Sequence, residues 1–157
     1  MLKYYFHDVV FQEIPNETTL AINLTNCPNR CVGCHSPHLQ EDTGNPLDEN
    51  ILSEWIKKYG DAITCICFMG GDSEPLEVCR LAGFVKSLAG NLKTGWYSGK
   101  TRLPDGITLA NFDYIKLGPY EKRFGGLDKP TTNQRFYHIK EGRMIDRTGM
   151  FFENTKR

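Results

Sequence analysis

A strand that is apolar on both faces constrains this fold more than any other feature. Residues 62–69 read Ala-Ile-Thr-Cys-Ile-Cys-Phe-Met, with almost no alternation between apolar and polar side chains. Such a run is typical of a strand that is covered on both sides in a parallel sheet. Gly70 and Gly71 end the run, and apolar residues of helical period follow from Leu81 to Leu88. The sequence therefore predicts an α/β architecture around this strand.

Further helices and strands are predicted along the chain. Asp48 is a good N-cap for one helix, and Gly60 is a fitting residue at its end. A second helix has Pro75 in its first turn and Gly90 at its end. Short apolar runs predict strands at 9–11, 19–24, 94–97, 112–117 and 136–139, before a polar, Arg-rich tail. This alternation predicts a mainly parallel sheet, in which ligands bind at the carboxyl ends of the strands.

The composition indicates one folded domain. The chain has 157 residues, of which 39% are apolar and 11% aromatic, and it contains no internal repeat. We therefore expect a single domain over residues 1–157. No run approaches the about 18 to 20 apolar residues of a membrane-spanning helix, and the first residues lack the apolar stretch of a signal peptide. These features predict a cytoplasmic protein with no membrane partner.

The net charge is zero, but the charges are unevenly distributed. Residues 1–78 contain 4 basic and 12 acidic side chains, whereas residues 79–157 contain 15 basic and 7 acidic ones. One interpretation is that the two halves fold together and partly neutralise each other. The other is a basic face in the second half that binds an anionic ligand or an acidic partner. The zero net charge gives little support to nucleic-acid binding.

Three of the six cysteines form one loop directly after the second predicted strand. Cys27, Cys31 and Cys34 have the spacing C-x3-C-x2-C, which lets three thiolates converge on one metal centre. An iron–sulfur cluster with only these three ligands would keep one iron open for chemistry. Two alternatives remain open. One is a structural zinc site completed by His35 or His38, and the other is a set of cysteines that bind no metal.

The other three cysteines fit a different role. Cys65 and Cys67 alternate on the apolar strand, and Cys79 lies near the apolar side of the second helix. Disulfides are rare in the cytoplasm, and no second C-x2-C pair is present to complete a zinc site. These residues are therefore predicted to fill core positions as small buried hydrophobes.

The segment Gly70-Gly71-Asp72 is a candidate ligand site because it ends one strand and precedes a helix. Two glycines let the backbone approach a ligand closely, and Asp72 offers an acceptor for an ammonium group. The amides at the start of the following helix favour an anionic group such as a carboxylate. Together these features suit the head group of an amino acid. The alternative is an ordinary turn in which Asp72 or Ser73 caps the helix.

In combination, these motifs resemble the radical S-adenosylmethionine (SAM) superfamily. The three loop cysteines match its C-x3-C-x2-C motif, and Gly70-Gly71-Asp72 matches its Gly-Gly-acid strand end. Within the superfamily the chain is most similar to the activating proteins of anaerobic (class III) ribonucleotide reductase. This closer similarity is carried by the segments 33–37, 113–120 and 131–135.

The resemblance implies a partial, open (β/α) barrel of the radical SAM type. It also implies a [4Fe-4S] cluster on Cys27, Cys31 and Cys34, with the amino and carboxylate groups of SAM on the open iron. The reduced cluster would cleave SAM to methionine and a 5′-deoxyadenosyl radical. That radical would take a hydrogen atom from one glycine of the partner reductase and leave a glycyl radical. A one-electron donor such as flavodoxin would be a second partner.

The resemblance further implies roles for individual residues. The SAM-binding residues would be Gly33, Cys34, His35, Gly70, Gly71, Asp72 and Lys116. His35 could donate to a cluster sulfide or to SAM, or it could be a surface histidine. Lys116 could reach the SAM carboxylate from the end of its strand, or it could be solvated. The basic residues that would suit docking onto a large acidic partner are Lys122, Arg123, Lys129 and Arg135.

Other functions remain compatible with the sequence. The chain could activate a different glycyl radical enzyme, or it could apply the same chemistry to a small molecule, although its length leaves few loops to enclose one. A non-enzymatic alternative is a zinc-stabilised binding module with Cys27, Cys31, Cys34 and His38 as ligands. Anaerobic purification discriminates between these classes, because a brown, oxygen-sensitive protein cannot be a zinc module.

Overall fold

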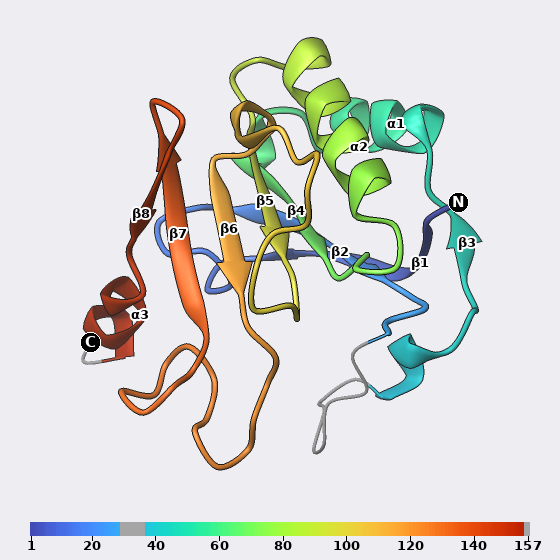
Figure 1. Ribbon diagram of the computed structural model, residues 1–157. Helices are drawn as coiled ribbons and strands as arrows, with labels where there is room; N and C mark the ends of the chain where they lie inside the picture. The colour runs from blue at the N-terminus through green and yellow to red at the C-terminus, as the bar shows by residue number, and fades with distance from the viewer. Residues whose placement is uncertain (29–36, 156–157) are drawn as a thin grey trace.

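An eight-stranded sheet forms the centre of the computed structural model, which describes residues 1–28 and 37–155 (Figure 1). In chain order the strands are β1 (Lys3–Val10), β2 (Thr19–Leu24), β3 (Asn45–Pro46), β4 (Cys65–Met69), β5 (Lys93–Tyr97), β6 (Tyr114–Leu117), β7 (Arg135–Lys140) and β8 (Arg143–Asp146). The α-helices are α1 (Glu49–Tyr59), α2 (Pro75–Leu88) and α3 (Gly149–Thr155), and the 3-10 helices are η1 (Pro37–Gln40), η2 (Gly60–Ala62) and η3 (Leu109–Asn111). Across the sheet the strand order is β3-β1-β2-β4-β5-β6-β7-β8.

The sheet is mixed, so the prediction of a mainly parallel sheet in a partial, open (β/α) barrel is wrong. Only the pairs β2–β4, β4–β5 and β5–β6 are parallel. The pairs β1–β2, β1–β3, β6–β7 and β7–β8 are antiparallel. A (β/α) barrel requires a helix after each strand, whereas three short α-helices are present in the part of the chain that the structure describes.

The short connections explain the antiparallel edges. Glu141 and Gly142 alone join β7 to β8, and both have positive φ (53° and 73°), as two-residue hairpin turns require. Between β5 and β6 the chain forms only the single turn η3 and no α-helix. Parallel neighbours need a long crossover connection, usually a helix. The helices α1 and α2 supply such crossovers only to the centre of the sheet.

Both faces of the sheet centre are buried, which confirms the prediction for the apolar strand. On one face, Ile66 and Phe68 of β4 pack in a core with α1 and α2, the two helices above the sheet in Figure 1. On the other face, Cys65 and Cys67 pack in a second core. The remaining buried members of this second core are Ile14, Tyr97, Tyr114, Phe136 and Phe151.

The predicted helix boundaries are largely confirmed. Asp48 is the N-cap of α1 and accepts a 3.0 Å hydrogen bond from the Ile51 amide, and Gly60 is the C-cap with φ of 52°. Pro75 lies in the first turn of α2, but this helix ends at Leu88, just before the expected Gly90. No helix in the described residues is long and apolar enough to cross a membrane.

Two elements cover the face opposite α1 and α2. The loop at residues 11–18 places Ile14 in the second core with no exposed surface, and Tyr97 donates its hydroxyl hydrogen to the Glu13 carbonyl. The sequence had predicted only a polar tail at the C-terminus, yet α3 follows β8 there. Its Phe151 packs edge-on against Phe136, with 5.0 Å between ring centroids. The loop and α3 therefore cover the second core, so that this face of the sheet needs no crossover helices.

Candidate functional site

The carboxyl ends of the parallel strands meet at one edge of the sheet, the lower edge in Figure 1. The register pairs Asn23 of β2 with Met69 of β4, Met69 with Tyr97 of β5, and Tyr97 with Lys116 of β6. The segments that follow these residues are therefore neighbours. They include Cys27 and three of the residues predicted to bind SAM, namely Gly70, Gly71 and Asp72.

Cys27 opens the cysteine loop at this edge. Its amide donates a 2.9 Å hydrogen bond to the Leu39 carbonyl, and the Asn26 amide donates one of the same length to the Glu41 carbonyl. These bonds hold the two ends of the loop together, as the convergence of several thiolates on one centre requires. The structure leaves Cys27 partly exposed.

The rest of the predicted cluster site lies outside the described residues. This applies to Cys31, Gly33, Cys34 and His35, and to the side chain of His38. Among the residues that are described, no three His, Cys, Asp or Glu side chains are grouped so that they could hold a metal ion. Cys27 is thus the one predicted cluster ligand whose place in the fold is known.

Gly70 and Gly71 form a turn that only glycine fits. Both have positive φ, 105° and 84°, a region that other residues rarely adopt. A Cβ on Gly71 would lie 2.5 Å from Val78 Cγ2 and 2.9 Å from Leu24 Cδ1. The Gly70 carbonyl accepts a 2.7 Å hydrogen bond from the indole N–H of Trp96. The glycine pair therefore brings the end of β4 into close contact with β2 and β5.

Asp72 turns toward the end of β5 and does not cap a helix. Its Oδ1 accepts a 2.5 Å hydrogen bond from the Ser98 hydroxyl, and its Oδ2 accepts a 2.8 Å bond from the Gly99 amide. The N-cap of α2 is Glu74, whose side chain makes no capping bond. The alternative of a simple capping turn at Asp72 or Ser73 is therefore wrong. Bonds to both oxygens fix the plane of the Asp72 carboxylate.

Lys116 is buried at the end of β6, with only 8% of its surface exposed. Its Nζ donates to the carbonyls of Ser98 (2.8 Å) and Gly118 (3.1 Å) and lies 5.7 Å from the centroid of the Tyr97 ring. Carbonyl dipoles and an aromatic face stabilise an ammonium group that has lost most of its water. Lys116 is therefore a fixed part of this edge and not a solvated lysine.

Ser98 connects these two charged residues and was not among the site residues predicted from the sequence. Its hydroxyl binds Asp72, its carbonyl accepts from Lys116 Nζ, and its amide donates to the Lys116 carbonyl at 2.9 Å. A signal was present, because Ser98 and Gly99 follow a predicted strand in the same way as Gly70 and Gly71 do.

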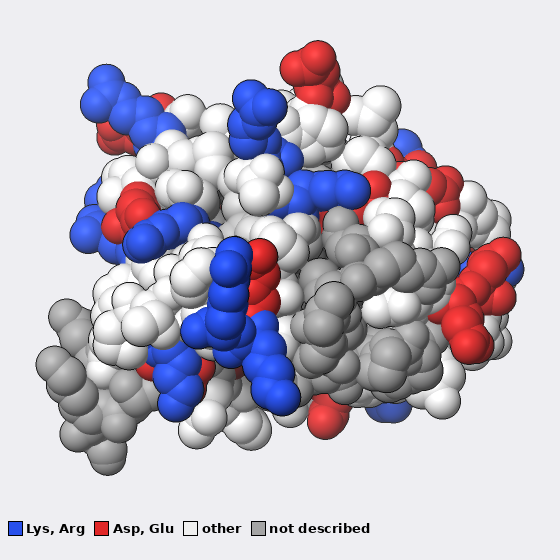
Figure 2. Space-filling view, turned by 60° about the horizontal axis from the view of Figure 1, so that its bottom comes forward, with Lys and Arg blue, Asp and Glu red and all other residues white. Residues whose placement is uncertain are grey.

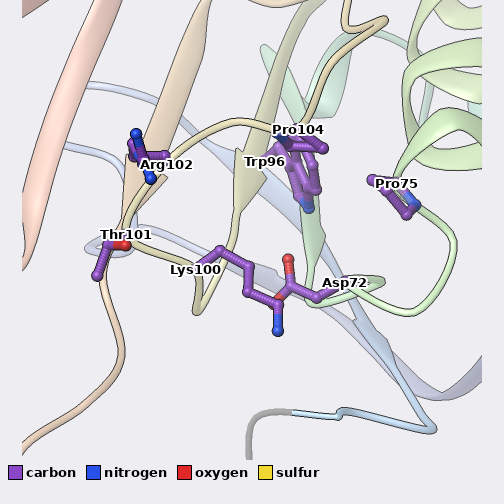
Figure 3. Close-up of a pocket in the computed structure, with 7 residues that line it drawn as sticks. All are labelled: Asp72, Pro75, Trp96, Lys100, Thr101, Arg102 and Pro104. Atoms are coloured by element: carbon purple, nitrogen blue, oxygen red, sulfur yellow. The ribbon is translucent and has the colours of Figure 1, made fainter.

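Two cavities open beside this group of residues. The smaller has a volume of about 260 Å³ and lies between the start of α2 and the loop after β5 (Figure 3). In Figure 3, Trp96 and Pro104 form one side of it, opposite Pro75, and Asp72 and Lys100 lie at one end. The larger has a volume of about 1110 Å³ and lies on the other face of the sheet. Its lining includes Phe11, Glu13, Tyr97, Lys116, Lys122, Lys129, Gln134 and Phe151.

The four predicted docking residues lie on or next to the loop between β6 and β7. All four are exposed, and Lys122 and Lys129 line the larger cavity. The ion pairs of Arg123, Lys129 and Arg135 are long, between 3.7 and 4.0 Å, and such exposed pairs contribute little. In Figure 2, which turns the lower edge of Figure 1 forward, basic side chains gather over the left and centre.

The three cysteines predicted for the core are buried. Cys65 and Cys67 have no exposed surface, and Cys79 is 5% exposed. Burial, followed by the nearby Glu17 carboxylate, raises the pKa of the Cys65 thiol, and burial also raises the pKa of Cys67. Both thiols therefore stay protonated, whereas metal ligation requires a thiolate.

Comparisons with known proteins add no family assignment. The chain matches no model of a known protein family, no curated protein and no solved structure. The resemblance to radical SAM activating proteins therefore remains a prediction from the sequence motifs.

Proposed function

We propose that this protein is a radical SAM activase that generates a glycyl radical on an anaerobic ribonucleotide reductase. The observation that carries the proposal is the convergence of three motifs at one sheet edge. Cys27 follows β2, Gly70-Gly71-Asp72 follows β4, and Lys116 lies near the end of β6. Open α/β sheets bind ligands at this edge. Residues chosen from separate sequence motifs thus become neighbours in the fold.

The cysteine loop would hold the cofactor. Cys27, Cys31 and Cys34 are the residues that would bind a [4Fe-4S] cluster, and the joined ends of the loop at Cys27 and Leu39 fit that role. When bound, the cluster supplies the electron for reductive cleavage of SAM to methionine and a 5′-deoxyadenosyl radical.

The neighbouring residues would bind the amino-acid end of SAM. Asp72 accepts a hydrogen bond from its ammonium group, and Lys116 attracts its carboxylate. The glycine pair keeps the chain close to β2, since a side chain on Gly71 would overlap Leu24 and Val78. Because Lys116 is buried, its charge acts in a medium of low dielectric, where electrostatic attraction is stronger than in water.

The larger cavity suits a protein substrate. It is open to the outside and measures about 1110 Å³, so that a loop of the reductase could bring its glycine to Lys116 and Tyr97. Transfer of one hydrogen atom from that glycine to the 5′-deoxyadenosyl radical would give 5′-deoxyadenosine and would leave the radical on the reductase. The basic residues around the cavity mouth would attract an acidic partner surface.

A one-electron donor such as flavodoxin completes the proposed reaction, because each SAM cleavage consumes one electron. A cytoplasmic location is part of this proposal, since the thiolates that hold a cluster must stay reduced.

Anaerobic reconstitution with iron and sulfide, followed by dithionite and SAM, tests this function. The expected product is 5′-deoxyadenosine from the wild-type protein and none from Cys31→Ala. A protein that forms no cluster, yields no product and instead contains stoichiometric zinc would overturn the proposal in favour of a binding module. Addition of the reductase, with electron paramagnetic resonance as the readout, then tests for the glycyl radical.

A further inference from the structure

Ser98 connects two residues of opposite charge that would bind the two ends of an amino-acid head group. Its side chain holds Asp72, and its backbone holds Lys116. We propose that Ser98 is the positioning residue that fixes the spacing of this acceptor and this donor, so that the site selects ligands with a free α-amino-acid end. This inference rests on the proposed function, because it concerns how the same site recognises SAM.

The bonds to Asp72 determine how its carboxylate faces the site. The Ser98 hydroxyl donates to Oδ1 at 2.5 Å, and the next amide, that of Gly99, donates to Oδ2 at 2.8 Å. Hydrogen bonds to an ionised carboxylate are roughly twice as strong as neutral ones. Loss of the hydroxyl would remove the bond to Oδ1, so that the plane of the carboxylate is held less firmly.

The bonds to Lys116 determine where its ammonium group lies. Both backbone groups of Ser98 bind this lysine: the amide donates to its carbonyl at 2.9 Å, and the carbonyl accepts from Nζ at 2.8 Å. The first bond belongs to the parallel ladder in which Tyr97 pairs with Lys116. The position of the ammonium group thus depends on the same residue that orients Asp72.

Ser98 itself is held firmly. Only 1% of its surface is exposed, and its hydroxyl oxygen also accepts a 3.1 Å bond from the Lys100 amide. A buried residue with these contacts acts through Asp72 and Lys116 and not by touching the ligand. Hydrogen bonds that already hold the binding side chains in place lower the conformational entropy that these side chains lose when a ligand binds.

Two non-cleaved ligands test the proposal on the anaerobically reconstituted protein. S-adenosylhomocysteine carries the amino-acid end, and 5′-methylthioadenosine lacks it. For Ser98→Ala we expect the dissociation constant of S-adenosylhomocysteine to rise about tenfold, the size of one hydrogen bond to a charged group. Binding of 5′-methylthioadenosine should change less than about twofold, and Ser98→Thr should restore wild-type affinity.

Ser87→Ala is the matched control. Ser87 is an exposed serine of α2 whose hydroxyl donates to the Phe84 carbonyl at 2.8 Å, so its loss should change neither constant. A double-mutant cycle with Asp72→Asn adds a sharper readout. If Ser98 acts through Asp72, the double variant binds S-adenosylhomocysteine no more weakly than Asp72→Asn alone.

Several results would overturn the inference. These are additive losses in the cycle, unchanged affinity in Ser98→Ala, and equal losses for both ligands together with a lower melting temperature. If Ser98→Ala does not fold, Ser98→Cys replaces it, because a thiol keeps a side chain of similar shape but donates weakly. Failure of the proposed function is distinguishable, since the wild-type protein would then form no cluster and cleave no SAM.

Discussion

The hydroxyl of Tyr114 donates a 2.5 Å hydrogen bond to Oε2 of Glu17, which joins β6 to the loop before β2. The same oxygen accepts from Lys93 Nζ at 2.8 Å, and Oε1 accepts from the Thr64 hydroxyl at 2.8 Å. Burial, and then the adjacent Glu17 carboxylate, raise the pKa of Tyr114, so that this tyrosine remains a donor. One buried carboxylate therefore connects β5 and β6 to Thr64, the residue before β4, at the sheet edge opposite the candidate site.

Glu17→Ala should consequently destabilise the protein without touching the site. We expect a loss of about 2 to 4 kcal/mol, because three donors lose a charged acceptor and Tyr114 is left buried without a partner. Urea denaturation measures this change. Glu13→Ala is the control, since Glu13 is exposed and its backbone carbonyl, which accepts from Tyr97, is kept in alanine. Equal losses in the two variants would contradict the prediction.

Gly71→Ala should be more harmful than the same change at a glycine of similar conformation. Gly71 and Gly142 have φ of 84° and 73°, so each alanine costs about 1 to 2 kcal/mol in backbone strain. Only at Gly71 would the new Cβ overlap a side chain, at 2.5 Å from Val78 Cγ2, whereas nothing lies within 4 Å at Gly142. Overpacking adds about 1 to 3 kcal/mol.

Free energies of unfolding from urea titrations compare the two variants directly. A loss in Gly71→Ala that is no greater than the loss in Gly142→Ala would show that the end of β4 can shift to accept a side chain. That result would also weaken the argument that the glycine pair is required by close packing at this edge.

The sequence predicted the elements that have strong local signals. The capped helix α1 and the doubly buried strand β4 were found because caps and hydrophobic period are encoded within a few residues. The strands at the edges of the sheet were harder to predict from the sequence. In β1 the adjacent Tyr5 and Phe6 are both exposed, and the pairing with β2 shifts between Tyr4 and Phe6, which breaks the alternation that indicates a strand.

Strand direction and the contacts of the site depend on distant parts of the chain. The polar strand β8 and the seven-residue helix α3 carry few local signals, and they make the sheet mixed. Asp72 and Lys116 could be assigned to one edge because each ends or follows a predicted strand. Their link through Ser98 could not be predicted from the sequence, since Asp72 and Ser98 are 26 residues apart in the chain.

His7 should make the stability of the protein sensitive to mild acid. It stacks on Trp55, with 4.1 Å between ring centroids, and burial followed by the charge of Lys58 lowers its pKa below the ordinary value of 6.5. The unfolded chain then binds a proton more readily than the folded one as the pH falls below about 6.5, so acid favours unfolding. The effect ends once the pH is below the folded pKa.

Denaturation at about pH 7.5 and about pH 5 checks the sign of this effect. The wild-type protein should lose more stability between these values than His7→Phe, which keeps a ring against Trp55 but cannot be protonated. Lys58→Gln should show an intermediate loss, because it removes only the second cause of the shift. A larger loss in His7→Phe than in the wild type would refute the assignment.

Charge reversal at the cavity mouth tests how the proposed partner is recognised. Lys122 and Arg123 are exposed, and the ion pair of Arg123 with Glu121 is long, at 3.9 Å. Lys122→Glu combined with Arg123→Glu should therefore leave the fold intact. It should lower the rate of glycyl radical formation roughly tenfold at low salt, because steering by opposite charges is lost.

The salt dependence separates steering from other effects. Added salt should slow activation by the wild-type protein and change the double variant little, since exposed charges are screened within about 10 Å at 0.1 M salt. Lys57→Glu with Lys58→Glu is the control, because these residues lie on α1, far from the lower edge in Figure 1. If both double variants activate the reductase at the wild-type rate, the basic loop after β6 does not dock the partner, and another surface must.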